Sequence, residues 1–77
     1  MKWALCLSNE GYEIDLEAFK AYRIVEDENA TRHGCIRIVD ESGEDYVYPA
    51  GRFEVLRLAA PAEKRLSQAV AAFAATA

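Results

Sequence analysis

The stretch of residues 35–55 constrains the fold of this chain more than any other part of its sequence. Two strand-like runs of mostly apolar residues, 35–40 and 45–48, flank an acidic turn that contains Gly43. In both runs alternate side chains share a face, which predicts strands, and glycine in the closing position of a short turn is typical of a β-hairpin. The strand residues that we expect to meet across this antiparallel hairpin are Ile36, Ile38, Tyr46 and Tyr48.

Pro49 ends the second of these runs, because proline has no N–H to donate to a neighbouring strand. Further strands are predicted at residues 2–7, 20–26 and 53–58. Residues 12–19 read as an irregular loop that turns Ile14 and Leu16 inward, and residues 26–34 read as a polar loop with room for one helical turn. Five short strands separated by turn signals predict a small β-barrel over residues 1–58, because a chain of this length protects its sheet edges most simply by closing them.

The last part of the chain is rich in alanine and predicts an α-helix over residues 61–75. Its apolar residues recur at helical spacing, and Pro61 suits a first helical position. The expected molecule is therefore one mainly β domain spanning residues 1–77, with a five-stranded barrel and a C-terminal helix. A helix of about 15 residues is marginal in water unless one face is covered. We expect its apolar stripe to support self-association with a second copy of the chain; the stripe is Leu66, Val70 and Phe73.

Composition narrows the classes of function. The net charge is −4, and the basic residues are scattered, so nucleic acid is a disfavoured partner, since phosphate binding relies on Lys and Arg. No apolar run approaches the roughly 20 residues that span a bilayer, and the first residues do not form a signal-peptide core. The cysteines, Cys6 and Cys35, lie far apart in sequence, which favours two buried thiols in a reducing compartment. We expect a cytoplasmic protein.

Two clusters invite a chemical interpretation. Four acidic residues in the turn of residues 40–45 superficially resemble cation ligands, but the turn lacks the length and the distal glutamate of a calcium loop, so we interpret it as a solvated hairpin tip. His33 and Cys35 are two residues apart on an extended chain, about 7 Å, which is too far for the histidine to activate the thiol. We therefore expect neither a catalytic residue nor a bound metal or cofactor.

Aromatic residues offer the best candidates for a contact surface, because Tyr and Trp anchor interfaces while keeping a polar group available. In a chain this short most aromatic residues belong to the core, and we expect Trp3, Tyr22 and Phe53 there. The residues that we expect to be exposed around a shallow binding groove are Tyr12, Tyr48, Pro49 and Arg52.

The region from about residue 16 to residue 55 resembles an SH3-like barrel. Residues 20–25 look like its second strand, residues 35–48 like its central hairpin, and residues 48–53 like the turn of 3₁₀ helix before its last strand. More narrowly, the chain is similar to a set of short bacterial proteins without an established activity. They share the turn of residues 40–46, followed by a Tyr-Pro pair and an aromatic residue.

This resemblance implies a fold and no particular chemistry. The chain lacks the tyrosine-rich motif and the tryptophan pair of peptide-binding SH3 domains, and Phe53 stands where those domains use a tyrosine. A proline-rich peptide is therefore not the expected partner. The prediction is a non-enzymatic protein-interaction module. The alternative is a small barrel associated with nucleic acid or the ribosome, which would use Lys20, Arg23, Arg37, Arg52 and Arg57.

Overall fold

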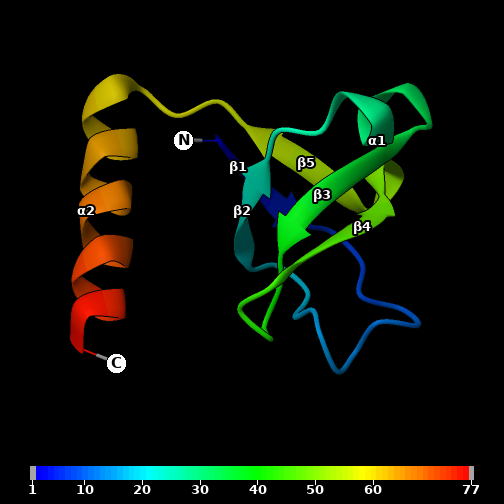
Figure 1. The fold of residues 1–77 in the computed structure, drawn as a ribbon, viewed down its shortest axis with the longest axis horizontal. Coiled ribbons are helices and arrows are strands. Elements are labelled where there is room, and N and C mark those ends of the chain that lie inside the picture. Colours follow the sequence, from blue (N-terminus) through cyan, green and yellow to red (C-terminus); the bar gives the residue numbers. More distant parts are fainter. Residues whose placement is uncertain (1, 77) are drawn as a thin grey trace.

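The computed structural model describes residues 2–76 and consists of one antiparallel sheet and a C-terminal helix (Figure 1). Within these residues, five strands, two helices and one 3₁₀ turn follow one another. They are β1 (Lys2–Cys6), β2 (Ala21–Val25), α1 (Glu28–Arg32), β3 (Cys35–Val39), β4 (Asp45–Pro49), η1 (Ala50–Arg52), β5 (Phe53–Leu56) and α2 (Ala60–Thr76). The mainly β architecture and the C-terminal helix predicted from the sequence are confirmed.

The strands lie in the order β4-β3-β2-β1-β5, and each neighbouring pair is antiparallel. The hairpin predicted from the alternating pattern is present, with Ile36 opposite Tyr48 and Ile38 opposite Tyr46. Gly43 has a φ of 85° in its turn, a conformation that glycine adopts without steric cost.

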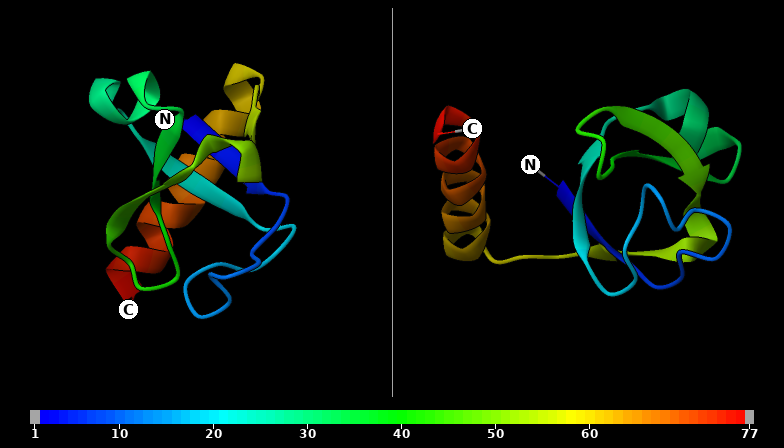
Figure 2. Two further views of the ribbon diagram at one scale, coloured as in Figure 1. Left: turned by 90° about the vertical axis from the view of Figure 1, so that its right-hand side faces the viewer. Right: turned by 90° about the horizontal axis from the view of Figure 1, so that it is seen from below.

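The sheet is strongly curled, and its connections explain why. The two outer strands, β4 and β5, are joined only by the three residues of η1. In a flat sheet these strands would lie about 19 Å apart, whereas three residues of 3₁₀ helix advance about 6 Å. The sheet must therefore bend until its edges approach each other, and Figure 2 shows the strands curling around a common centre. The rings of Tyr48 on β4 and Phe53 on β5 are accordingly 6.1 Å apart between centroids.

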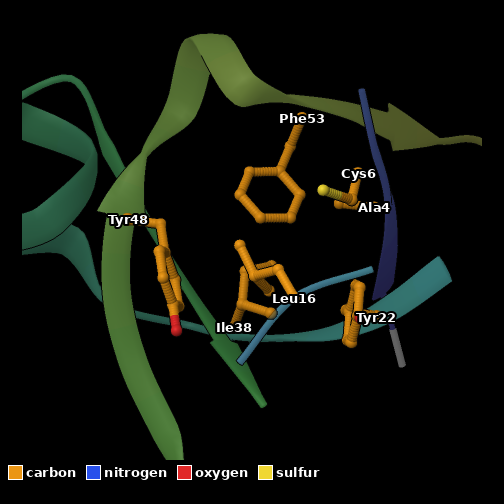
Figure 3. Close-up of a cluster of buried hydrophobic side chains, with 7 residues drawn as sticks. All are labelled: Ala4, Cys6, Leu16, Tyr22, Ile38, Tyr48 and Phe53. Atoms are coloured by element: carbon orange, nitrogen blue, oxygen red, sulfur yellow. The ribbon is translucent and has the colours of Figure 1, made fainter. Parts of the chain in front are cut away.

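A single hydrophobic cluster fills the concave side of this curled sheet, and every strand contributes to it (Figure 3). Tyr22 and Phe53 are buried, as predicted. The members of the cluster are Ala4, Cys6, Leu16, Tyr22, Ile38, Tyr48 and Phe53.

Leu16 is the one member of this cluster that does not come from a strand. The N–H groups of Asp15 and Leu16 both donate to the carbonyl of Tyr12, at 3.1 and 2.9 Å. This tight turn directs Leu16 into the core, where it is fully buried, and leaves Ile14 92% exposed. The prediction that both side chains turn inward is therefore correct for Leu16 and wrong for Ile14, because a turn does not keep alternate residues on one face.

Helix α2 lies beside the convex face of the sheet, along β1 and β2 (Figures 1 and 2). Trp3 belongs to β1 but is not a member of the core cluster, since β-strand side chains alternate between faces and its neighbours Ala4 and Cys6 point into the core. It is nevertheless only 7% exposed and lines the space between the sheet and α2. Its predicted burial is confirmed, on the face opposite the core.

Candidate functional site

Of the four residues predicted to form a groove, Tyr12, Tyr48 and Arg52 come together in space, and Pro49 follows Tyr48 in the chain. Tyr12 lies in the loop between β1 and β2, Tyr48 and Pro49 end β4, and Arg52 ends η1. The edge of one tyrosine ring meets the face of the other, with the centroids of Tyr12 and Tyr48 5.1 Å apart at 89°. The Arg52 guanidinium lies over the Tyr12 ring, 5.2 Å from its centroid. We refer to Tyr12, Pro49 and Arg52 as the aromatic surface.

Tyr48 does not belong to the exposed part of this surface, and the prediction that it is exposed is wrong. It is 5% exposed and lies in the core, as Figure 3 shows. Its hydroxyl donates to the Asp40 carboxylate at 2.6 Å, which is what allows a polar group to be buried there. Tyr48 therefore supports Tyr12 from beneath, while Pro49 is exposed and Tyr12 and Arg52 are half-exposed.

Arg52 is fixed by more than the contact with the tyrosine ring. Its Nη1 atom donates to the hydroxyl of Ser8 at 3.4 Å and to the carbonyl of Glu10. No carboxylate among the described residues forms an ion pair with it, although Glu13 lies near enough that, after backbone hydrogen bonds, the charge of Arg52 contributes to lowering the pKa of that carboxyl. A held arginine stacked on tyrosine is a common arrangement at the centre of protein interfaces.

The acidic turn after β3 has a structural role. Asp40 is 5% exposed, and its carboxylate accepts hydrogen bonds from the Ser42 backbone N–H at 2.9 Å, the Ser42 hydroxyl at 2.5 Å and the Tyr48 hydroxyl at 2.6 Å. The interpretation of the whole turn as a solvated tip is wrong for Asp40, which fastens the turn to the core. Glu41, Glu44 and the start of β4 at Asp45 are exposed, as expected.

A second network joins the same turn to the loop between β1 and β2. The Tyr22 hydroxyl donates to the Glu41 carboxylate at 2.5 Å and accepts from the Glu17 N–H at 2.7 Å. Lys20 donates to the same carboxylate at 2.6 Å. Burial and this hydrogen bond raise the pKa of Tyr22, so the phenol stays protonated and remains a donor. The loop and the hairpin tip are therefore held against each other through Glu41.

These networks make stability dependent on pH. Burial raises the pKa of Asp40, but hydrogen bonds from Ser42 and Tyr48 outweigh burial and leave the pKa below its ordinary value. Hydrogen bonds from Lys20 and Tyr22 lower the pKa of Glu41. A carboxyl group with a depressed folded pKa contributes its full stabilisation above the unfolded pKa and loses it as the pH falls through the folded value.

We therefore expect the melting temperature to be constant from pH 7 to about pH 5 and to fall steadily below about pH 4.5, where unfolded carboxyl groups begin to take up protons. Circular dichroism melts between pH 7 and pH 3 measure this. Asp40→Asn should flatten the decline, whereas Glu44→Gln, at an exposed position, should leave it unchanged. A melting temperature that is equal at pH 7 and pH 3.5 would contradict the role assigned to these carboxylates.

The side chains of His33 and Cys35 both contact backbone carbonyl groups. The Cys35 thiol donates to the backbone carbonyl of His33 at 3.5 Å, and the His33 imidazole Nδ1 lies 2.7 Å from the carbonyl of Asn29. Cys6 and Cys35 are both free; Cys6 is buried as expected, whereas Cys35 is only half-buried. Burial raises the pKa of the Cys6 thiol, which disfavours the reactive thiolate.

Helix α2 presents the apolar stripe unevenly. Leu66 and Val70 are half-buried, and Phe73 is 75% exposed. Val70 and Phe73 line a cleft shared with the sheet, so part of the stripe faces the chain's own β1 and β2. Self-association through Leu66, Val70 and Phe73 stays a prediction. The cleft was not predicted from the sequence, because its floor depends on which strands pair. In addition, neither Trp3 nor Arg23 belongs to a recognisable sequence motif.

Comparison with known proteins gives no further assignment. No model of a protein family matches the chain, and neither a curated protein nor a solved structure matches it. Within residues 2–76, no group of three or more His, Cys, Asp or Glu residues is placed to hold a metal ion. The same residues contain no helix with the length and apolar character needed to cross a membrane.

Proposed function

We propose that the curled sheet is an SH3-like barrel and that the protein is a non-enzymatic interaction module whose aromatic surface binds a protein partner. The strand order β4-β3-β2-β1-β5 and the 3₁₀ turn between β4 and β5 support the barrel, since the resemblance in the sequence implies that turn. A cytoplasmic location belongs to the proposal, because both cysteines are free thiols, as is usual in reducing compartments.

One observation carries the proposed contact: Tyr12 is held between the buried Tyr48 ring and the Arg52 guanidinium while remaining half-exposed. A side chain that is already ordered loses little conformational entropy when a partner covers it. The unpaired charge of Arg52 favours a partner segment with an acidic residue next to an apolar one. Pro49, next to Tyr48 at the end of β4, is exposed and has no polar side-chain group that would need a partner.

The alternative of a nucleic-acid or ribosome-associated barrel has weaker support. Arg37 pairs with Asp27 at 2.7 Å and with Asp45 at 3.1 Å, and Lys20 pairs with Glu17 and Glu41. Two of the five basic residues that this function would use are therefore neutralised by neighbouring carboxylates. The other three, Arg23, Arg52 and Arg57, form no ion pair with a described residue, so the charge available to contact a phosphate backbone is reduced but not removed.

A capture experiment with matched baits tests the protein contact. The immobilised wild-type protein, Tyr12→Ala and Tyr46→Ala are compared by quantitative mass spectrometry in extracts of the source cells. Tyr46 is also an exposed tyrosine, outside the aromatic surface. We expect at least one protein that the wild type and Tyr46→Ala retain equally and that Tyr12→Ala retains at least about tenfold less, as expected for the loss of a central anchor residue.

Each bait must first show the wild-type circular dichroism spectrum, so that a loss of capture reports a lost contact. A set of captured proteins that does not differ among the three baits would contradict the proposal. So would the absence of any protein that the wild type captures in excess of a blank resin.

A further inference from the structure

The cleft between α2 and the sheet has the size of a small-molecule site. Its volume is about 470 Å³, within the range of roughly 300–1,000 Å³ that is common for ligand pockets. Trp3 on β1 and Arg23 on β2 lie in its floor, and Val70 and Phe73 of α2 form its opposite wall. Trp3 and Arg23 are direct neighbours across the two strands. The cleft therefore combines aromatic and aliphatic walls with one guanidinium.

Two residues that line the floor carry a polar group without a partner among the described residues. The indole N–H of Trp3 is buried without a hydrogen bond, the one such side-chain group found there. Arg23 is half-buried, and none of the ion pairs between described residues includes it. Buried donors are almost always satisfied in native proteins, and leaving a donor buried and unpaired costs free energy. The guanidinium of Arg23 can only donate hydrogen bonds, so the partner that it lacks is an acceptor.

The charges that line the cleft limit what that acceptor can be. Lys20 is engaged by Glu41 at 2.6 Å, and the Asp40 carboxylate is engaged by Ser42 and Tyr48. Arg23 is thus the only cation lining the cleft that is not already paired with a described residue. One guanidinium next to two carboxylates favours a single negative charge over the double charge of a phosphate monoester. The apolar walls in turn require an apolar body rather than a bare inorganic anion.

We propose that this cleft binds a medium-chain aliphatic carboxylate. Its carboxylate pairs with the Arg23 guanidinium, a planar group that matches carboxylate geometry. Its chain lies between Trp3 and the α2 residues Val70 and Phe73. This site is separate from the aromatic surface and does not depend on the proposed protein contact.

Tryptophan fluorescence measures binding at this site directly, because Trp3 is the only tryptophan of the protein. The purified full chain is titrated with sodium octanoate below its micelle concentration while the fluorescence of Trp3 is recorded. We expect a saturable change in intensity and emission maximum, together with a shift of the indole N–H signal in proton–nitrogen correlation spectra. Arg23→Met should weaken octanoate binding at least about tenfold, since it removes a charged hydrogen-bond donor.

Two controls separate the proposed site from non-specific binding. Arg32→Met removes an exposed arginine of α1 that does not line the cleft. This variant should bind octanoate as tightly as the wild type does. 1-Octanol has the same chain without the charge and should bind the wild type at least about tenfold more weakly than octanoate does. A fluorescence change that does not saturate with octanoate would overturn the proposal. So would equal binding of octanol and octanoate by the wild type, or equal binding of octanoate by the wild type and Arg23→Met.

Discussion

Replacing Asp40 with alanine is expected to lower the free energy of unfolding by about 3 kcal/mol. The substitution removes three hydrogen bonds to a buried carboxylate, two from Ser42 and one from Tyr48. It also leaves the Tyr48 hydroxyl buried without a partner, because that side chain is only 5% exposed. A domain of this size has a total stability of about 4–11 kcal/mol, so this single change would remove a large part of it.

Urea denaturation followed by Trp3 fluorescence measures the effect. Glu44→Ala is the matched control, because Glu44 is an acidic residue of the same turn that is exposed and accepts one side-chain hydrogen bond, from Tyr46 at the surface. Its denaturation midpoint should match the wild type. Equal midpoints for Asp40→Ala and Glu44→Ala would show that the turn is not fastened through Asp40.

The second large effect concerns Leu16. Leu16→Ala is expected to lower the free energy of unfolding by about 3 kcal/mol, within the range of roughly 2–5 kcal/mol found when a buried leucine is truncated and leaves a cavity. Leu16 is fully buried although it belongs to a loop. Its loss would weaken both the core and the contact that holds the segment between β1 and β2 in place.

Ile14→Ala provides the comparison within the same loop, because Ile14 is 92% exposed. This variant should unfold at the same urea concentration as the wild type. The pair of substitutions distinguishes an anchored loop from a mobile one. If Leu16→Ala and Ile14→Ala had equal midpoints, the loop would not contribute to the core.

The strands could be predicted from the sequence because side chains on alternate positions take opposite faces of a sheet. This rule located the hairpin of β3 and β4. It failed for Ile14, because the hydrogen bonds of Asp15 and Leu16 to the Tyr12 carbonyl form a turn in which alternation does not hold. The exposure of Ile14 is therefore determined by the hydrogen bonds of this turn rather than by the hydrophobicity of its side chain.

The candidate site was predictable only in part, and for a related reason. Tyr12, Tyr48 and Arg52 do come together, but the sequence does not reveal that the Asp40 carboxylate lies within reach of the Tyr48 hydroxyl. That pairing makes the burial of Tyr48 favourable and so decides which tyrosine is displayed. A hydrogen bond between side chains that are separated in the sequence leaves no pattern in the sequence around either residue.

The position of β1 has a consequence for the order in which the molecule assembles. This first strand pairs on one side with β2 and on the other with β5, so that Trp3 lies opposite Leu56. During synthesis one edge of β1 stays unsatisfied until the last strand has left the ribosome. The β3–β4 hairpin closes a short loop and can form early, whereas the pairing of β1 with β5 joins segments far apart in sequence and is slow. Strand β1 is thus synthesised before the other four strands, but its pairing with β5 is the last to form.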